Sequence, residues 1–356
     1  MLRSLGLLGV LGTLGALGVF GLVEVDATGS PEPAVVFAFA DPAIEESSGL
    51  VVDAGSGLFV TVNDSGDGGR VFTVDPATGR TVGTTRWDER PRDVEALAPA
   101  GPGEVWVADI GDNDAERDLV SVRRVPVAAG EVDASGSTTY DLVYPDGARD
   151  AETLMVDPDG RLVIVTKGLL GGEVLRTEQP LDAARPNRMT RIGVAVPIAT
   201  DGAFFPDGRH VIVRSYGSAV VYTYPSLDEV GSFSLPDQEQ GEGIAVGASG
   251  AVFVSSEGAG SEVLRVPLPR DVRRVVAPSE PDPSVTASPG GDRGTGPDSE
   301  AAGDDDLRPP PEPGAQWPWI VAGLVLLLLV ALLTTLAVLL VVGVRRVLRR
   351  RGPPDG

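Results

Sequence analysis

The chain has 356 residues, a formal net charge of −22, a single histidine and no cysteine. The missing cysteine excludes disulfides, iron–sulfur clusters, thiolate zinc and cysteine nucleophiles, and a lone His210 argues against a histidine-rich metal site. The acidic balance argues against nucleic acid as a partner. Glycine and proline make up about a fifth of the chain, which favours many short strands joined by turns over long helices.

The first 27 residues have the pattern of a secretory signal. Met1-Leu2-Arg3 is a short basic start, and the stretch from Ser4 to Val23 carries no charge. Val25-Asp26-Ala27 offers small residues at the two positions that a signal peptidase reads. We predict a signal peptide over residues 1–27. An uncleaved N-terminal anchor is the alternative, because about twenty apolar residues can just span a bilayer.

Residues 31–275 contain a repeat of five units, each with β-rich runs separated by turns. The first strand of each unit follows a small or acidic residue, and the second strand ends at a glycine. The leading acid precedes this glycine by 16 residues in four units, and Ser48 precedes it by 18 in the first unit. A recurring spacing of this kind indicates a structural repeat. Third and fourth strands follow in each unit, except that the fifth unit has no fourth strand before the composition changes.

The strand predicted over Ala34–Ala40 precedes the first unit and can supply the missing fourth strand of the last. Such a pairing joins the first unit to the last and removes the open sheet edges. Four-stranded units of 41 to 57 residues, as found here, are typical of propeller blades. We therefore predict an all-β fold, a five-bladed β-propeller over residues 31–275, with six blades as the alternative. The turns at Asp157–Gly160 and Phe205–Gly208 are the hairpins expected between first and second strands.

The rest of the chain predicts a stalk, a membrane span and a short tail. Residues 276–316 are rich in proline, glycine and aspartate, as in a disordered stalk. Residues 317–344 begin with two tryptophans and continue without charge from Ile320, which predicts a transmembrane helix. Five arginines within residues 345–356 place this tail in the cytoplasm by the positive-inside rule. The propeller would then lie outside the cell membrane, on a single-pass anchor.

Acidic residues recur at the start of the innermost strands, which line the channel of a propeller. Equivalent positions hold Ser48, Glu95, Glu152, Asp201 and Glu242, and Asp93 and Asp150 lie two residues earlier in two units. Carboxylates that converge on one mouth repel each other, and protonation or a hard cation such as Ca²⁺ relieves the repulsion. We therefore predict a possible Ca²⁺ site at Glu95, Glu152, Asp201 and Glu242. The alternative is that each acid accepts hydrogen bonds from a neighbouring blade and fixes the packing.

A second ring is predicted where the second strands end. It has mixed charge and contains the only lysine of the chain, and its members are Asn63, Asp64, Asp109, Lys167, Arg214 and Glu257. Carboxylates that hold a cation beside a lysine and an arginine could bind a phosphate or a carboxylate. Salt bridges between adjacent blades are the alternative role.

Four motifs carry a resemblance to known families, namely Ser47-Ser48-Gly49-Leu50, Asn63-Asp64-Ser65-Gly66, Asp75-Pro76-Ala77-Thr78-Gly79 and Asp93-Val94-Glu95-Ala96-Leu97. Together they resemble the SdiA-regulated and phytase-like esterase β-propeller families, over about residues 46–258. The resemblance implies a propeller, and it implies phosphoesterase or esterase activity. Only Glu242-Gly243-Ile244-Ala245 keeps the glycine of the second family element, whereas Glu95-Ala96 and Glu152-Thr153 depart from it.

The sequence predicts a bacterial cell-surface propeller that binds a ligand or partner at its acidic channel mouth. The partner could be an envelope protein, a glycan or a small molecule. A Ca²⁺-dependent phosphoester or ester hydrolase and a purely structural envelope protein are the alternatives. No catalytic residue and no oligomeric state follow from the sequence.

Overall fold

Residues 32–277 are described in the computed structural model of the protein, and the chain there is almost entirely β-strand. The predicted signal peptide (1–27), transmembrane helix (317–344) and tail (345–356) lie outside these residues, as does the predicted stalk from residue 278 onward. Within the described residues, no helix is both long enough and apolar enough to cross a membrane.

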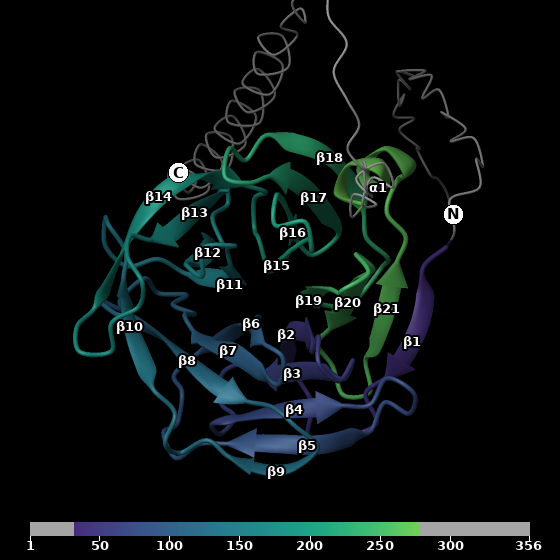
Figure 1. Ribbon diagram of the computed structural model, residues 1–356, viewed down its shortest axis with the longest axis horizontal. Helices are drawn as coiled ribbons and strands as arrows, with labels where there is room; N and C mark the ends of the chain where they lie inside the picture. The colour runs from purple at the N-terminus through teal and green to yellow at the C-terminus, as the bar shows by residue number, and fades with distance from the viewer. Residues whose placement is uncertain (1–31, 278–356) are drawn as a thin grey trace, which may run out of the picture. The chain divides into compact units, whose positions relative to one another are not determined.

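Five strands surround a central axis, and each contacts the next around a closed ring (Figure 1). These inner strands are β2 (Ser47–Val52), β6 (Val94–Gly101), β11 (Ala151–Val156), β15 (Asp201–Phe204) and β19 (Gly241–Val246). Each is rich in apolar residues, and Leu50, Leu97 and Leu154 are almost fully buried. Each inner strand pairs with its second strand along one edge and contacts both neighbours in the ring.

Each inner strand continues outward through an antiparallel meander. The second strands are β3 (Phe59–Asn63), β7 (Glu104–Asp109), β12 (Leu162–Thr166), β16 (His210–Arg214) and β20 (Val252–Ser256). The third strands are β4 (Arg70–Val74), β8 (Val120–Pro126), β13 (Gly172–Thr177), β17 (Ser218–Thr223) and β21 (Glu262–Val266). The outer strands are β5 (Thr81–Arg86), β10 (Thr139–Val143), β14 (Asn187–Ala195), β18 (Glu229–Ser234) and β1 (Ala34–Ala38). Sheets arranged radially in this way form a β-propeller, which confirms the predicted all-β propeller architecture.

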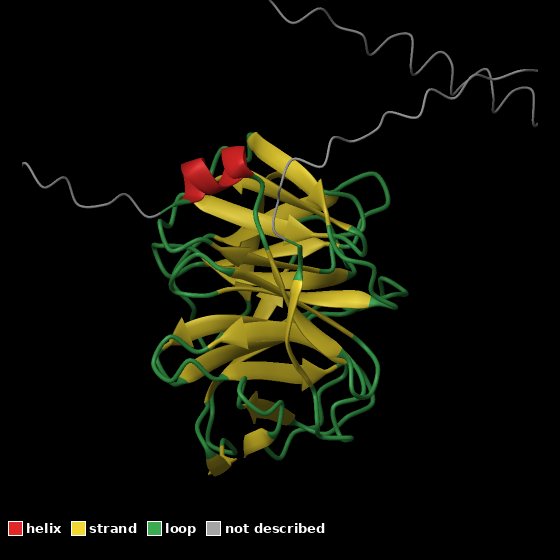
Figure 2. Ribbon diagram, turned by 90° about the vertical axis from the view of Figure 1, so that its right-hand side faces the viewer, coloured by secondary structure: helices red, strands yellow, loops and turns green. Residues whose placement is uncertain are grey.

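The sheets are joined at their outer edges in two places. The parallel pair β10–β14 merges two meanders into one eight-stranded sheet, and β9 (Gly130–Asp133) adds a parallel strand to β5. The remaining two sheets have four strands each. Apolar clusters fill the spaces between neighbouring sheets, for example Val163 of β12 with Val211 of β16. Figure 2 shows the sheets from the side.

The first strand closes the ring, as predicted for Ala34–Ala40. β1 pairs antiparallel with β21, with Ala34 opposite Arg265, and completes the sheet that contains β19 and β20. Three phenylalanines pack across this junction, with 5.1 Å between the ring centroids of Phe37 and Phe59 and also between those of Phe59 and Phe253. Closure without disulfides therefore rests on strand pairing and edge-to-face aromatic packing.

Two elements were not predicted from the sequence. One is β9, and the other is the helix α1 (Arg270–Val276), which lies at the outer edge of the propeller beside β18 (Figure 1). The helix has seven residues and no side-chain cap, so its own hydrogen bonds cannot stabilise it. Val272 and Val276 are buried in the apolar cluster beneath it, which supplies the stabilisation.

Candidate functional site

The two rings predicted from the sequence lie at the same end of the channel. Antiparallel pairing sets the start of each inner strand beside the end of its second strand, so that Val94 faces Asp109 and Asp201 faces Arg214. Residues of both predicted rings therefore meet at one opening. We call this opening the acidic mouth and define it by Asp64, Asp93, Glu95, Glu152, Lys167 and Glu242.

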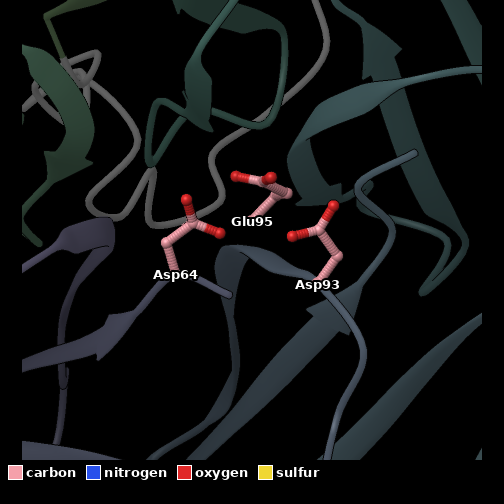
Figure 3. A group of neighbouring side chains, drawn as sticks. All are labelled: Asp64, Asp93 and Glu95. Atoms are coloured by element: carbon pink, nitrogen blue, oxygen red, sulfur yellow. The ribbon is translucent and has the colours of Figure 1, made fainter. Parts of the chain in front are cut away.

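Three carboxylates of the acidic mouth point toward one another (Figure 3). Asp64 follows β3 directly, Asp93 precedes β6, and Glu95 is the second residue of β6. One oxygen from each side chain lies within 4.8 Å of the others. Oxygens that bind one Ca²⁺ at about 2.3–2.6 Å can be about 5 Å apart at most, so this spacing suits a single ion.

Neighbouring residues hold two of these carboxylates in place. The Ser48 hydroxyl of β2 donates to the backbone oxygen of Glu95 at 3.0 Å and to its Oε2 at 3.2 Å. A Cβ atom at Gly111 would lie 2.4 Å from Oδ2 of Asp93 and 2.6 Å from Oε1 of Glu95. The carboxylates can therefore occupy this position only because residue 111 has no side chain.

The carboxyl groups of the cluster hold their protons unusually tightly. Burial, followed by the carboxylates of Asp64 and Asp150, raises the pKa of Asp93 to about 6. Burial, followed by Glu152 and Asp64, raises the pKa of Glu95 to about 10. Several negatively charged carboxylates in a partly buried site are thus unfavourable until a proton or a cation balances their charge.

Glu152, Lys167 and Glu242 are the other members of the acidic mouth. The Lys167 ammonium pairs with Oε1 of Glu152, and it lies 5.4 Å from the ring centroid of Tyr216. Burial, followed by Glu242, raises the pKa of Glu152 to about 8 in spite of this lysine. Burial also raises the pKa of Glu242 to about 7, and Glu257 adds to the effect. Burial alone would lower the pKa of Lys167, but Glu152 outweighs it and raises this pKa.

Two buried carboxylate oxygens have no hydrogen-bond partner among the described residues. They are Oε2 of Glu152 and Oε2 of Glu242, and each of these residues is only 3% exposed. A buried polar atom without a partner costs about 1–3 kcal/mol, so it usually meets water, an ion or a ligand. Both atoms belong to the acidic mouth, which gives a second reason to place a bound group there.

Asp201 and Arg214, predicted for the rings, are bonded within the protein. Oδ1 of Asp201 accepts from its neighbour Gly202, and Oδ2 accepts from the backbone N–H of Ile244 in the next sheet, both at 2.7 Å. Arg214 is fully buried and donates to the carbonyls of Gly243 and Ser255 at 2.9 and 3.2 Å. Both side chains thus join the sheet of β15–β18 to the sheet of β19–β21.

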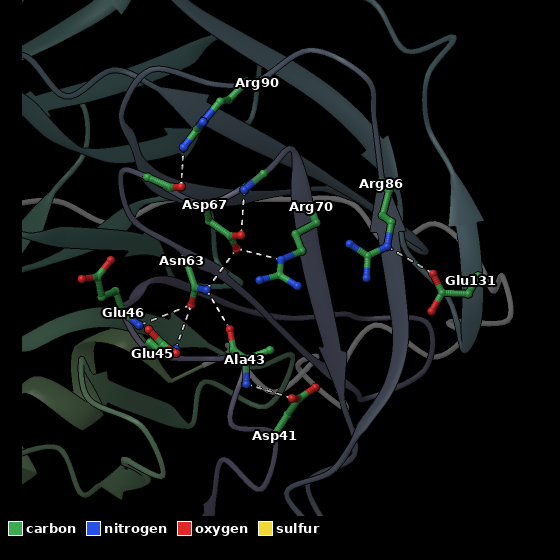
Figure 4. A network of polar contacts seen from close by, with 12 residues as sticks. Asp41, Ala43, Glu45, Glu46, Asn63, Asp67, Arg70, Arg86, Arg90 and Glu131 are labelled. Carbon is green, nitrogen blue, oxygen red and sulfur yellow. Dashed lines mark hydrogen bonds and ion pairs between the residues drawn. The ribbon is translucent and has the colours of Figure 1, made fainter.

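Asn63, the first residue of the second predicted ring, organises the loops beside the acidic mouth (Figure 4). Its Oδ1 accepts from the N–H groups of Glu45 and Glu46 at 3.1 and 3.3 Å. Its Nδ2 donates to the Ala43 carbonyl at 2.8 Å and to Asp67 at 3.0 Å. All of its polar atoms are engaged, so Asn63 supports the position of the adjacent Asp64.

Asp109, Asp150 and Glu257 surround the cluster. Asp109 accepts the N–H groups of Arg92 and Asp93 and pairs with Arg117 at 2.8 Å, which fixes the backbone that carries Asp93. Asp150 accepts the N–H of Asp112 at 2.9 Å. Glu257 accepts from Gln240 at 2.7 Å, and burial, followed by Asp64 and Glu46, raises its pKa.

No motif or spacing in the chain singles out Arg117, Tyr216 or Gln240. Arg117 and Tyr216 lie in loops that follow second strands, at the same end as the predicted second ring. Gln240 lies immediately before the inner strand β19. Their position relative to strand ends was the available signal, but only the folded loops bring them beside the carboxylates.

Comparison with known proteins adds little to this geometry. No family model matches the chain, and no curated protein matches it. Solved structures that resemble it include a gluconolactonase from Xanthomonas campestris, with 16% identity, 67% of this chain and 80% of that chain covered, and a TM-score of 0.41. A putative 6-phosphogluconolactonase from Bacteroides uniformis has 16% identity, with 63% and 68% covered and a TM-score of 0.38. A luciferin-regenerating enzyme has 12% identity, with 67% and 96% covered and a TM-score of 0.40. At such scores these similarities bear on neither the ligand nor the activity of this chain.

Proposed function

We propose that the protein is a ligand-binding β-propeller of five blades that holds a hard divalent cation at the acidic mouth. The chemistry of the ligand atoms favours Ca²⁺ as this cation. The blade count takes each inner strand as the start of one blade and the parallel β10–β14 pair as a contact between two blades. The single observation that carries the cation is the convergence of Asp64, Asp93 and Glu95 within 4.8 Å.

The donor atoms decide which metal fits. All three groups are carboxylates, and the chain has no cysteine. The one histidine, His210, bonds to Asp207 in a hairpin at 2.6 Å, apart from the cluster. A site made only of oxygen suits Ca²⁺, Mg²⁺ or Mn²⁺ rather than Zn²⁺ or Cu²⁺. The three carboxylates come from different positions, Asp64 after β3, Asp93 before β6 and Glu95 within β6, and Ca²⁺ tolerates such irregular coordination better than Mg²⁺ does.

A cation at this position would create a binding site for an anionic or oxygen-rich small molecule. Ca²⁺ takes six to eight oxygen ligands in total, so three carboxylates leave positions for a ligand or water. Lys167 pairs with Glu152 at the same mouth, and its ammonium can also donate to a carboxylate or phosphate oxygen of a ligand. We therefore propose that the ligand is a small molecule with such a group, held between the cation and Lys167.

Calorimetric titration of the full chain with Ca²⁺ tests the cation site. Wild-type protein should bind one ion, and Asp93→Asn and Glu95→Gln should each weaken binding at least about tenfold, because ligand charge sets Ca²⁺ affinity. Glu131→Gln is the matched control, since it removes the same charge from an exposed pair with Arg86.

Gly111→Ala should weaken Ca²⁺ binding with no change of charge, whereas Gly136→Ala, with open space around it, should not. Wild-type protein that binds no Ca²⁺, or equal affinity in the carboxylate variants and Glu131→Gln, would disprove the site.

A second candidate function is hydrolysis of an ester or phosphoester. Glu242 and Glu152 have pKa values raised to about 7 and 8, so either can exchange a proton near neutral pH, as general acid–base catalysis requires. Water would attack the carbon or phosphorus atom, and the departing oxygen would take up a proton. The resemblance to the phytase-like esterase families motivates this hypothesis.

Hydrolysis of p-nitrophenyl acetate and p-nitrophenyl phosphate, with Ca²⁺ or with chelator, tests the second candidate. An enzyme should lose activity with chelator, and Glu152→Gln should lower kcat at least about a hundredfold. A substitution of Gln238 would not be a suitable control, because Gln238 accepts a hydrogen bond from the buried Arg214. Glu131→Gln, in its exposed pair with Arg86, is therefore the control here as well. Saturable Ca²⁺ binding without hydrolysis of either compound would support the ligand-binding function and exclude hydrolysis of these two classes of substrate.

A further inference from the structure

We propose that the opposite end of the channel is a second binding site, which takes a small uncharged apolar molecule such as an aryl or short alkyl group. A cavity of about 200 Å³ lies there. All five inner strands contribute to its wall, among them Leu50, Leu97, Met155, Phe204 and Ile244. A dry apolar cavity of about 150 Å³ is large enough for benzene, so this cavity can hold a ligand of that size or somewhat larger.

The chemistry of the wall sets the class of ligand. Every residue that lines the cavity is apolar, so no lining side chain can accept or donate a hydrogen bond or balance a charge. Charged groups in the adjacent turns are already engaged. Asp53 accepts from Ser56 and Gly103, and Asp157 pairs with Arg176 at 2.9 Å. A charged ligand would lose its hydration here without any side chain to balance its charge, so the wall favours an uncharged, largely apolar molecule.

The cavity is formed in advance and can be reached from solvent. Each inner strand is paired to a second strand and packed against both neighbours of the ring, so the wall does not collapse inward easily. Val52, Val156 and Val246, the last residues of three inner strands, are partly exposed and mark the open end. Met155 gives the wall an adaptable side chain, because methionine accommodates ligands of different shape.

The cavity and the acidic mouth share no residue, and the inner strands approach one another closely between them. A Cβ atom at Gly49 would lie 2.7 Å from the backbone nitrogen of Leu97, and one at Gly243 would lie 2.9 Å from Cβ of Leu50. Glycine at these positions lets neighbouring strands approach closely, between the carboxylates above and the leucines below. The apolar site is therefore expected to act independently of the cation at the acidic mouth.

Methionine-methyl NMR of the full chain tests this proposal at a single residue. The chain has three methionines, Met1, Met155 and Met189, of which Met155 lines the cavity and Met189 is buried in a different apolar cluster. Titration with benzene should shift the ¹³C-methyl signal of Met155 in a saturable way, because the bound ring lies beside it. The Met189 signal should stay in place. Chelator or Ca²⁺ should not change the benzene affinity, so failure here is distinct from failure of the cation site.

Ala203→Phe fills the cavity from β15 and should weaken benzene binding at least about tenfold. The binding is followed by the NMR signal of the Met155 methyl or of a backbone amide near the cavity. Val246→Phe narrows it from β19 and serves if Ala203→Phe does not fold. Ala183→Phe adds the same ring to an exposed turn and is the matched control. A Met155 shift that never saturates, equal shifts of Met155 and Met189, or undiminished affinity in a folded cavity variant would each overturn the proposal.

Discussion

Replacing Arg214 with methionine should lower the melting temperature of the protein by about 10 °C or more. The guanidinium is fully buried and satisfies carbonyl oxygens of Gly243 and Ser255 in the next sheet and of Ser215 and Tyr216 in its own loop. Removing one member of a buried charged network costs about 3–5 kcal/mol. For a domain of this size, 1 kcal/mol corresponds to roughly 2–4 °C. Burial lowers the pKa of Arg214 to about 10, which still leaves it charged at neutral pH.

Arg124→Met is the matched control for this experiment. Arg124 pairs with Glu104 on the surface, and both side chains are about half exposed. Exposed pairs contribute about 0–1 kcal/mol, so this variant should melt within a few degrees of wild type. Thermal unfolding followed by circular dichroism measures both. Equal melting temperatures for Arg214→Met and wild type would show that the buried arginine does not hold the two sheets together.

The repeated strands could be predicted because their information is local. Alternating apolar residues, turns such as Asp157–Gly160 and a constant spacing specify each hairpin without reference to the rest of the chain. The strand β9 and the helix α1 could not be predicted this way. β9 has the sequence Gly-Glu-Val-Asp and is ordered by pairing with β5, and α1 depends on the burial of Val272 and Val276. Both are products of tertiary contact.

The site was predictable as a set of positions but not as a set of roles. Asp201 and Glu242 both begin inner strands and are equivalent in the repeat. The short aspartate side chain reaches the N–H groups of Gly202 and Ile244, so it is bonded within the wall. The longer side chain of Glu242 leaves one oxygen without a partner among residues 32–277. One methylene group therefore separates a structural acid from a candidate ligand, and its effect depends on where the neighbouring sheet lies.

The channel separates charge from apolar surface along its length. Each inner strand begins near the carboxylates and ends in the apolar cavity, as in Glu152 followed by Leu154 and Met155 of β11. Burial of the carboxylates themselves is the largest cause of the raised pKa of Glu95 and Glu152. The same five strands thus build both ends of the channel, one with carboxylates and the other with apolar side chains.

Protein kept free of metal by a chelator should lose stability as the pH rises from about 5 to about 8, and Ca²⁺ should suppress this loss. A carboxyl group whose pKa is raised by folding stabilises the protein below its unfolded pKa, and the contribution is lost as the pH rises through the folded pKa. The pKa of Asp93 rises from 3.8 to about 6, that of Glu242 from 4.5 to about 7, and that of Glu152 from 4.5 to about 8. Their contributions therefore disappear within this interval, whereas that of Glu95, with a pKa of about 10, continues to fall above it.

Ca²⁺ competes with the same protons, so its stabilising effect should grow over the interval in which the chelated protein weakens. Melting curves in chelator and in millimolar Ca²⁺ should differ little near pH 5 and by several degrees near pH 8. The double variant Glu152→Gln, Glu242→Gln should flatten the pH dependence in chelator, because these two glutamates carry much of it. Glu131→Gln, with its exposed side chain, should retain it. A melting temperature that rises with pH in chelator would contradict the raised pKa values, and identical curves with and without Ca²⁺ at pH 8 would contradict a cation at the acidic mouth.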